Sequence, residues 1–300
     1  MPSVHIILFM TEEIAPKWAF RPLSKLKQNS LTVEVIADYA GGYSLDHAFN
    51  EVHHHFRRFD RKNFIKEIVP HPVFAFSTIE TGFWISQMAL HSEHENLVIF
   101  SNTAPRGDIE WVGEHRQPFV YALLDNGVPV FAVHAGYNLS FIKDRIKGIW
   151  EVKVPNTGTQ FRSRDQYPEA AMALLAMSGD QGKVGKPVDL KSIPSVPEYK
   201  VASVDGYGNL KTTIRRSDLK ESVKKSSVIR LTINRRARFA LNATNGAKGK
   251  TGDLCMVVGS SGGKKNPFIE FVRLQARAAN DFAIPGPYDD LGQITIESIA

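Results

Sequence analysis

The chain has 300 residues, of which 43% are hydrophobic, and it carries a formal net charge of +6 at pH 7. This length can bury a sizeable core in one large or two ordinary domains. The single cysteine excludes an internal disulfide framework, and no apolar run approaches the roughly 18 residues that cross a bilayer. Because the N-terminus also lacks the basic segment of a signal peptide, we expect a cytoplasmic protein without a membrane anchor.

The predicted elements of the first part alternate between strand and helix. An apolar run at 4–9 predicts a strand, and a run rich in β-branched residues at 31–40 predicts a second one. Further strands are expected at 97–100, 128–133 and 150–154, and an alanine-rich helix at 167–177. Between them, hydrophobic residues at spacings of three and four predict an amphipathic helix, with Phe49, Val52, Phe56 and Phe59 on its buried face. This alternation predicts an α/β fold with a mostly parallel sheet and flanking helices.

A proline-rich segment separates this part from a different kind of sequence. Residues 185–197 contain three prolines, which is typical of a linker. Beyond it, short strand patterns and turn signals with little helix predict an all-β module of about a hundred residues. We therefore divide the chain into an α/β domain at 1–187, a linker at 188–197 and an all-β domain at 198–300.

The positive charge is concentrated after residue 187. From Val188 onward the chain has 18 Lys and Arg against 11 Asp and Glu, whereas the first 187 residues have 19 against 20. Such a basic part is typical of a nucleic-acid interface or of a protein that attracts small anions, and it is equally compatible with a solvated surface. Aromatic residues are sparse between Arg215 and Arg238, where the charge is densest, so stacking on single-stranded nucleic acid is not favoured.

Several common ligand-binding motifs are absent from the sequence. It has no glycine-rich dinucleotide fingerprint, no phosphate-binding P-loop and no nucleophile elbow. The triplet at 53–55 (HHH) does not predict a metal site, because consecutive helical residues point about 100° apart and cannot converge on one ion. Cys255 has no base beside it in the sequence and is expected to be a buried thiol. We therefore predict no metal and no cofactor.

One turn in the second part combines groups that could hold a small polar ligand. The run at 205–210 (DGYGNL) places a carboxylate, an aromatic ring and a carboxamide within five residues, between two alternating strand patterns. Asp205 and Asn209 could grip a ligand from two sides while Tyr207 covers an apolar face. The same residues would also be ordinary in a plain hairpin.

Other polar segments lie at the ends of predicted strands and helices, where α/β proteins usually bind ligands. They are Asp38-Tyr39, residues 101–106 (SNTAPR), residues 125–127 (DNG) and residues 162–165 (RSRD). Turn and ion-pair chemistry explains each segment alone. Their order along the chain, together with the Asp205 turn, carries more information.

That order resembles the S-adenosylmethionine (SAM) hydroxide adenosyltransferases, the SAM hydrolases related to the SAM-dependent fluorinases and chlorinases. Residues 37–40 (ADYA) resemble the family's opening T-D-F-G, and 124–128 (LDNGV) resemble its P-D-N-G-L. Residues 160–165 (QFRSRD) resemble T-F-H-G-R-D, and 259–262 (GSSG) resemble N-S-x-G. The most specific match is at 205–214 (DGYGNLKTTI), which is similar to D-x-F-G-N-L-x-T-N-I. The resemblance covers about residues 31 to 280 and leaves residues 1–30 as an N-terminal extension.

This resemblance implies an α/β N-terminal domain, a C-terminal β-barrel and a homotrimer, with SAM as substrate between one subunit's first domain and its neighbour's second. Asp38 would hold the ribose hydroxyls, Asp205 would pair with the methionine ammonium, and Asn209 would bind the adenine edge. The remaining candidate contacts to the substrate are Tyr39, Asp125, Asn126, Tyr207, Phe239 stacked on adenine, Ser260 with Ser261 at the methionine carboxylate, and Arg273 where the family places backbone contacts to adenine.

The catalytic positions depart from the family pattern. The hydrolases activate water with an Asp–Arg–His set; here Arg106 would supply the arginine, Arg162 stands where the family has histidine, and 100–105 (FSNTAP) offers no carboxylate. Loss of a general base costs a factor of roughly 10²–10⁴. The sequence therefore leaves three functions open. They are a divergent SAM hydrolase that gives adenosine and L-methionine, a non-catalytic relative that binds SAM or another adenosyl compound, and a nucleic-acid-binding module.

Overall fold

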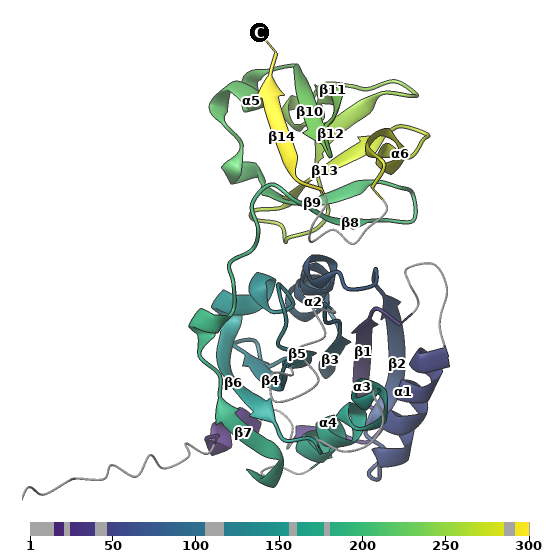
Figure 1. The fold of residues 1–300 in the computed structure, drawn as a ribbon, viewed down its shortest axis with the longest axis vertical. Helices are drawn as coiled ribbons and strands as arrows, with labels where there is room; N and C mark the ends of the chain where they lie inside the picture. The colour runs from purple at the N-terminus through teal and green to yellow at the C-terminus, as the bar shows by residue number, and fades with distance from the viewer. Residues whose placement is uncertain are drawn as a thin grey trace, which may run out of the picture.

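The chain folds around two seven-stranded sheets, one early and one late in the sequence (Figure 1). The structure is a computed structural model that describes residues 15–20, 25–39, 47–105, 117–155, 161–176, 181–284 and 292–299. The strand expected at 4–9 lies outside these residues. We call residues 15–193 the N-terminal part and residues 198–299 the C-terminal part. Within the described ranges, every helix is too short or too polar to cross a membrane.

The sheet of the N-terminal part is mixed. In spatial order its strands are β2 (Ile65–Pro72), β1 (Leu31–Ala37), β3 (Leu97–Asn102), β5 (Pro129–Val133), β4 (Phe119–Leu124), β6 (Ile146–Val152) and β7 (Val184–Pro187). The pairs β1–β2, β1–β3 and β3–β5 are parallel. The pairs β5–β4, β4–β6 and β6–β7 are antiparallel. The prediction of a mostly parallel sheet therefore holds for only half of the strand pairs.

A tight turn explains why the second half of this sheet is antiparallel. Residues 125–128 alone join β4 to β5, and Gly127 adopts a φ of 87° within them. The amide of Leu124 donates to the carbonyl of Val128 (3.0 Å), and the amide of Gly127 donates back to Leu124 (3.0 Å). So short a connection can join only antiparallel neighbours, since parallel strands need a crossover of a dozen or more residues.

Helices cover both faces of the N-terminal sheet. On one face lie α1 (His47–Phe59) and α4 (Tyr167–Ala176), with the short α3 (Arg162–Asp165) beside them. On the other face lie α2 (Thr78–His91) and the 3-10 helix η4 (Ser140–Arg145). The predicted apolar face of α1 is confirmed, because Phe49, Val52 and Phe56 are buried. Three further 3-10 helices are η1 (Lys17–Phe20), η5 (Gln181–Lys183) and η6 (Leu190–Ser192).

The sheet of the C-terminal part is curled and mainly antiparallel (Figure 1). In spatial order its strands are β14 (Ile294–Ser298), β10 (Val228–Ile233), β11 (Arg236–Asn242), β12 (Leu254–Val258), β13 (Phe268–Arg273), β9 (Leu210–Arg215) and β8 (Val201–Val204). Only the pair β11–β12 is parallel. Short helices accompany them: η7 (Arg216–Asp218), α5 (Glu221–Lys225), η8 (Ala243–Asn245) and α6 (Ala278–Phe282). The β-rich character predicted for this part is confirmed.

Backbone hydrogen bonds join the two edge strands of this curled sheet at one end. The amide of Val201 donates to the carbonyl of Gly292 (2.9 Å), and the amide of Ile294 donates to Tyr199 (2.7 Å). Lys200 and Gln293 form an isolated β-bridge between these contacts. The start of β8 is therefore fastened to the start of β14.

Helix α2 lies between the two sheets and joins the two parts (Figure 1). Phe83 of α2 packs on Phe268 of β13, with ring centroids 5.7 Å apart. The hydroxyl of Ser203 in β8 donates to the Glu80 carboxylate of α2 (2.7 Å). Further along the helix, the side-chain oxygen of Gln87 accepts from the amide of Gly262 (2.8 Å). One helix thus carries both the apolar and the polar contacts of the junction.

Gly82 permits the close approach of α2 to η4. A Cβ at this position would lie 2.2 Å from the carbonyl oxygen of Tyr137 and 3.0 Å from the ring of Phe141. We expect Gly82→Ala to lower the free energy of unfolding by about 1–3 kcal/mol, even though alanine is the better helix former. Urea denaturation measures this loss. Gly206→Ala is the control, because a Cβ there meets nothing within 4 Å, and equal stability of the two variants would refute the packing argument.

Candidate functional site

The carboxyl ends of β1 and β3 form the point where open α/β sheets usually bind ligands. From β1 the chain passes through α1 to β2 on one side, and then through α2 to β3 on the other side of β1. The two crossing helices lie on opposite faces of the sheet, so the strand order reverses between β1 and β3. A crevice at such a reversal is the usual ligand site of an open α/β sheet.

Asp38 lies at this reversal, directly after β1. Its amide donates to the carbonyl of Asn102 at the end of β3 (3.4 Å). Its Oδ2 accepts from the amide of Phe76 (3.0 Å), two residues before α2 begins. Asp38 therefore lies between the end of β3 and the loop before α2, and its role in ligand binding stays a prediction.

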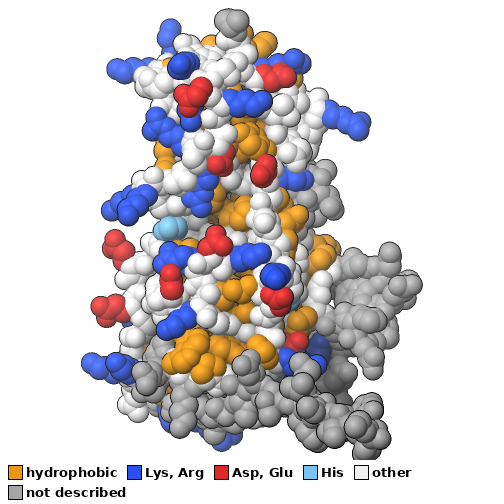
Figure 2. Space-filling model, turned by 90° about the vertical axis from the view of Figure 1, so that its left-hand side faces the viewer, with side chains coloured by type: hydrophobic (Ala, Val, Ile, Leu, Met, Phe, Trp, Pro, Cys, Tyr) orange, Lys and Arg blue, Asp and Glu red, His pale blue; other side chains and the backbone are white. Residues whose placement is uncertain are grey.

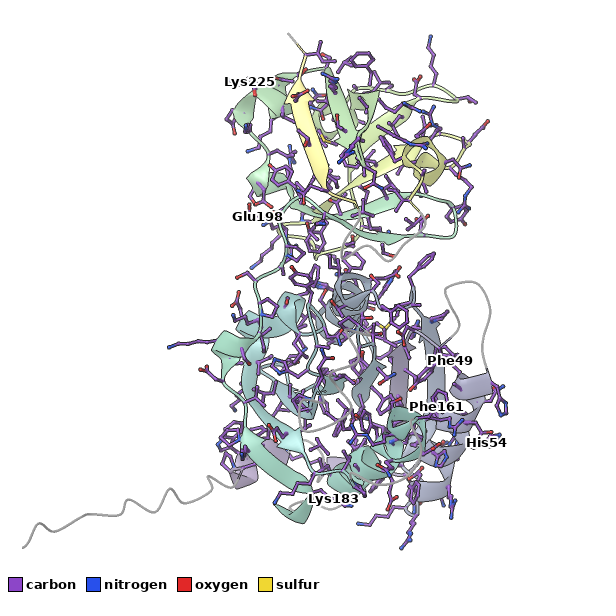
Figure 3. The ribbon with its side chains drawn as sticks, viewed as in Figure 1. Phe49, His54, Phe161, Lys183, Glu198 and Lys225 are labelled. Atoms are coloured by element: carbon purple, nitrogen blue, oxygen red, sulfur yellow. The ribbon has the colours of Figure 1, made fainter. Side chains whose placement is uncertain are left out.

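Tyr39 follows Asp38 and lies between α1 and α3. Its ring packs edge-on against Phe49 of α1 at 5.2 Å, and its hydroxyl is buried near Ser163. Burial raises the pKa of this hydroxyl, while the neighbouring Ser163 and Arg164 lower it. Phe161 and Phe49 mark this side of the N-terminal part in Figure 3. The structure therefore brings Tyr39 together with α3, the segment that also contains Arg162.

The turn at 205–209 is a hairpin organised by one carboxylate. Oδ1 of Asp205 accepts from the amides of Tyr207 and Asn209 (both 3.0 Å), and Oδ2 accepts from the Asn209 carboxamide (3.1 Å). These bonds are the ones that a plain hairpin needs. A carboxylate has about four lone-pair sites, so three bonds leave Asp205 capacity for one more donor. Tyr207 is 81% exposed at the tip.

Helix α6 and the residue before it stabilise this turn through two hydrogen bonds. The amide of Ala279 donates to the carbonyl of Gly208 (2.9 Å), and Arg277 donates to the carbonyl of Gly206 (2.9 Å). Gly208 has a φ of 81°, and a Cβ there would lie 2.7 Å from Cβ of Arg277. Glycine is therefore required at this position both for its backbone conformation and for the contact with α6.

A buried group of charges lies next to Asp205. Lys211 of β9 and Glu270 of β13 face each other across the sheet, with Nζ and Oε1 3.2 Å apart, and both are less than 10% exposed. The Lys211 ammonium is also 4.0 Å from Oδ2 of Asp205. The hydroxyl of Ser261 donates to the same Glu270 oxygen (3.1 Å). Two carboxylates share one ammonium here, so the group carries excess negative charge when ionised.

This buried group adjoins the N-terminal part through β8. Ser203 pairs with Lys211 in the sheet, and its hydroxyl is bonded to Glu80 in the first turn of α2. Glu80 also accepts from the amide of Phe74 (2.8 Å) in the loop before α2. The Asp205 turn is therefore connected to the loop that contacts Asp38 by a short series of hydrogen bonds.

Asp125 and Asn126 lie at the opposite edge of the N-terminal sheet from Asp38. They belong to the turn before β5, whereas Asp38 follows the parallel strand β1. The Arg145 guanidinium is 2.6 Å from Asp125, and its hydrogen bond lowers the pKa of that carboxyl. The Asn126 carboxamide donates to the carbonyl of Ala89 (2.8 Å). Both residues stabilise a turn, and the structure does not bring them together with Asp38.

The remaining candidate residues lie in the C-terminal part, with one exception. Phe239 of β11 is 69% exposed, and Ser260 is exposed beside the buried Ser261. Arg273 donates from Nε to Asp281 of α6 (2.6 Å). These residues come from separate strands and loops of the C-terminal part, whereas Arg106 lies outside the described residues.

Sequence reasoning missed Lys211 and Glu270 as members of the site. Alternation places Lys211 on the side of β9 opposite Leu210 and Ile214, which would normally face solvent. The available signal was a lone charge in each of two apolar runs, 210–214 (LKTTI) and 268–272 (FIEFV). Charged residues in strands are rarely buried unless paired.

Two solved structures show the same overall arrangement. One is an uncharacterized conserved protein from Thermotoga maritima, 19% identical with a TM-score of 0.64, and the match covers 88% of this chain and 99% of that one. The other is a conserved hypothetical protein from Thermus thermophilus, 14% identical with a TM-score of 0.60, covering 90% and 100%. The chain shares its fold with both proteins. No protein-family model and no curated protein sequence matches it.

The fold shared with the Thermotoga and Thermus proteins includes both sheets, because each match covers most of this chain. At these identities the similarity concerns the fold alone. The chemistry must therefore be argued from this chain's own residues. Near Asp38 these are acceptors and hydroxyls: Thr103 after β3 is bonded to Thr81 of α2 (2.8 Å), and Ser101 is buried without a described partner. Such groups can position a polar ligand.

Proposed function

We propose that the chain is a divergent SAM hydrolase that binds SAM between the Asp38 edge and the Asp205 turn and releases adenosine and L-methionine. The observation that carries this proposal is the excess negative charge of Asp205 and Glu270 over Lys211. It favours a cationic ligand, and SAM carries both a sulfonium and an ammonium. The trimer and the barrel implied by the family resemblance are part of the same proposal, with Asp205 supplied by a neighbouring subunit.

In this reaction a water oxygen attacks the ribose C5′. The new C5′–O bond forms as the C5′–S bond breaks, the electron pair leaves with sulfur, and methionine departs as a neutral thioether. The water proton passes to solvent. Asp38 would hold the ribose by accepting from its two hydroxyls, and Asp205 would accept from the methionine ammonium. Positioning of SAM and desolvation of the attacking water would supply most of the acceleration, with Arg106 and Arg162 as the candidate groups near the nucleophile.

A second candidate function is binding of SAM without turnover. The residues at the end of β3 favour it, since Ser101, Asn102 and, directly after the strand, Thr103 provide hydroxyl and amide groups where the resemblance calls for a carboxylate. The nucleic-acid function receives less support. Lys211 and Arg273 of the basic C-terminal part bind internal partners, which reduces the positive charge that faces outward.

Incubation of the purified chain with SAM, followed by chromatography, tests the proposal. Adenosine and methionine in equal amounts support hydrolysis. Calorimetric SAM binding without adenosine supports the second function instead, and loss of RNA binding with rising salt would support the third. Absence of both SAM binding and adenosine overturns the proposal.

Asp205→Asn tests whether the negative charge of this turn is needed for SAM binding, because it removes the charge and keeps the size of the side chain. Asparagine retains one oxygen for the amide bonds that Oδ1 of Asp205 accepts, but it loses the negative charge. We expect SAM to bind about tenfold or more weakly, the loss of one charge-assisted hydrogen bond. The unfolding temperature should fall only slightly, because the amide bonds remain and only the Asn209 carboxamide bond to Oδ2 is lost. Calorimetry measures the affinity. Asp144→Asn, at an exposed carboxylate of η4, is the control, and equal affinities of the two variants would exclude the role of Asp205.

A further inference from the structure

A pocket opens where the linker passes between the two parts. Its volume is about 430 Å³, which suits a small organic ligand. The residues that matter for recognition are Phe141, Glu198, Tyr199, Arg215, Asp218 and Phe268. Glu198 marks the level of this junction in Figure 3. Figure 2 views the molecule from the left-hand side of Figure 1. Midway along this face, hydrophobic side chains are visible between charged ones.

Arg215 gives the pocket a cationic end with a defined orientation. Its guanidinium carbon lies 3.6 Å from the centre of the Phe268 ring, and Phe268 also contacts Phe141 at 6.2 Å. Nη1 donates to the carbonyls of Gly262 (2.9 Å) and Asn266 (2.5 Å). Within the described residues, Nε and Nη2 make no hydrogen bond. These two N–H groups point in parallel from one side of the guanidinium, which is the geometry that binds both oxygens of a carboxylate.

Two carboxylates give the same pocket an acidic end. Asp218 accepts from the amide of Arg215 (2.7 Å), and its own carbonyl accepts from the Tyr199 hydroxyl (2.7 Å). Burial raises the pKa of Tyr199, and the charges of Asp218 and Glu198 raise it further. Asp218 and Glu198 both line the pocket and are exposed, so they form its solvent side.

We propose that this pocket binds a free α-amino acid with an apolar side chain. The ligand carboxylate accepts hydrogen bonds from Nε and Nη2 of Arg215, and the ligand ammonium pairs with the Asp218 carboxylate. The ligand side chain packs against Phe141 and Phe268. An anion without an ammonium would leave Asp218 without a cationic partner, and a cation without a carboxylate would leave Nε and Nη2 of Arg215 without an acceptor. This site uses neither Asp38 nor Asp205, so it stands independently of the proposed action on SAM.

Calorimetry and thermal unfolding of the full chain with L-phenylalanine test this inference. We expect L-phenylalanine to bind and to raise the unfolding temperature, because a ligand of the native state stabilises it. Phenylacetate lacks the ammonium and phenethylamine lacks the carboxylate, and each should bind at least about tenfold more weakly. No binding of L-phenylalanine at millimolar concentration overturns the proposal, as does equal binding of the three compounds.

Variants locate the binding in this pocket. Arg215→Gln should weaken binding of L-phenylalanine by at least about tenfold, whereas Arg216→Gln, at the exposed neighbouring side chain, should leave it unchanged. Asp218→Asn should weaken it as well, and it leaves the Arg215 contacts to Gly262 and Asn266 in place if Arg215→Gln fails to fold. Asp38→Ala should leave the affinity for L-phenylalanine unchanged. Loss of binding in Asp38→Ala, or full binding in both pocket variants, would place the amino acid elsewhere and refute the assignment.

Discussion

Replacement of Asp38 by alanine is expected to weaken SAM binding by at least about a hundredfold, which calorimetry would record as no measurable binding. The carboxylate lies at the strand-order reversal between β1 and β3 and would accept from two ribose hydroxyls. Alanine removes both of these charge-assisted bonds. It also removes the acceptor for the amide of Phe76, so the loop before α2 loses one of its contacts with β1.

Asp38→Asn separates these two effects. Asparagine retains an oxygen for the Phe76 amide but offers only one acceptor to the ribose. We expect its affinity for SAM to fall between those of the wild type and Asp38→Ala, with the wild-type unfolding temperature. If Asp38→Ala binds SAM normally while folded, as judged by circular dichroism, the assignment of this edge as the SAM site is wrong.

Lys211→Met is expected to lower the free energy of unfolding by about 3–5 kcal/mol, the usual cost of leaving a buried charge without its partner. Lys211 is 8% exposed, and its ammonium is the cation between Glu270 and Asp205. Methionine fills a similar volume but leaves two carboxylates facing each other without compensation. Urea denaturation at neutral pH measures the loss.

The double variant Lys211→Met with Glu270→Gln tests the electrostatic cause. Removing the Glu270 charge should restore part of the stability, while glutamine still offers an oxygen to the Ser261 hydroxyl. Lys250→Met, at an exposed lysine, is the matched control and should change little. If the double variant is as unstable as the sum of its single variants, charge compensation is not the reason for the buried lysine.

The helices and strands that could be predicted are those whose local hydrophobic pattern matches the burial that they have in the fold. The stripe of α1 and the apolar runs of β1, β3 and β5 follow directly from periodicity and β-branched content. β2 was missed because Pro70 and Pro72 interrupt its pattern. The structure accommodates them because β2 is the edge strand of the sheet, where a missing amide donor costs no ladder hydrogen bond.

The candidate site could be predicted only where it depends on a short stretch of chain. The Asp205 turn and the Asp38 edge were found because each combines a strand end with a polar residue. The burial of Lys211 and Glu270 depends on β9 pairing with β13, strands separated by more than fifty residues. Likewise, no local pattern distinguishes Asp125 from Asp38, and only the strand directions place them at opposite edges of the sheet.

The hydrogen bonds between the segments before β8 and β14 also bear on how the protein is made. The C-terminal sheet begins with β8, yet the amide of Val201 and the carbonyl of Tyr199 find their partners only at residues 292–294. β10 likewise lacks its second neighbour until β14 is present. During synthesis the edges of β8 and β10 therefore stay unpaired until residues 292–298 have been made and can join the sheet.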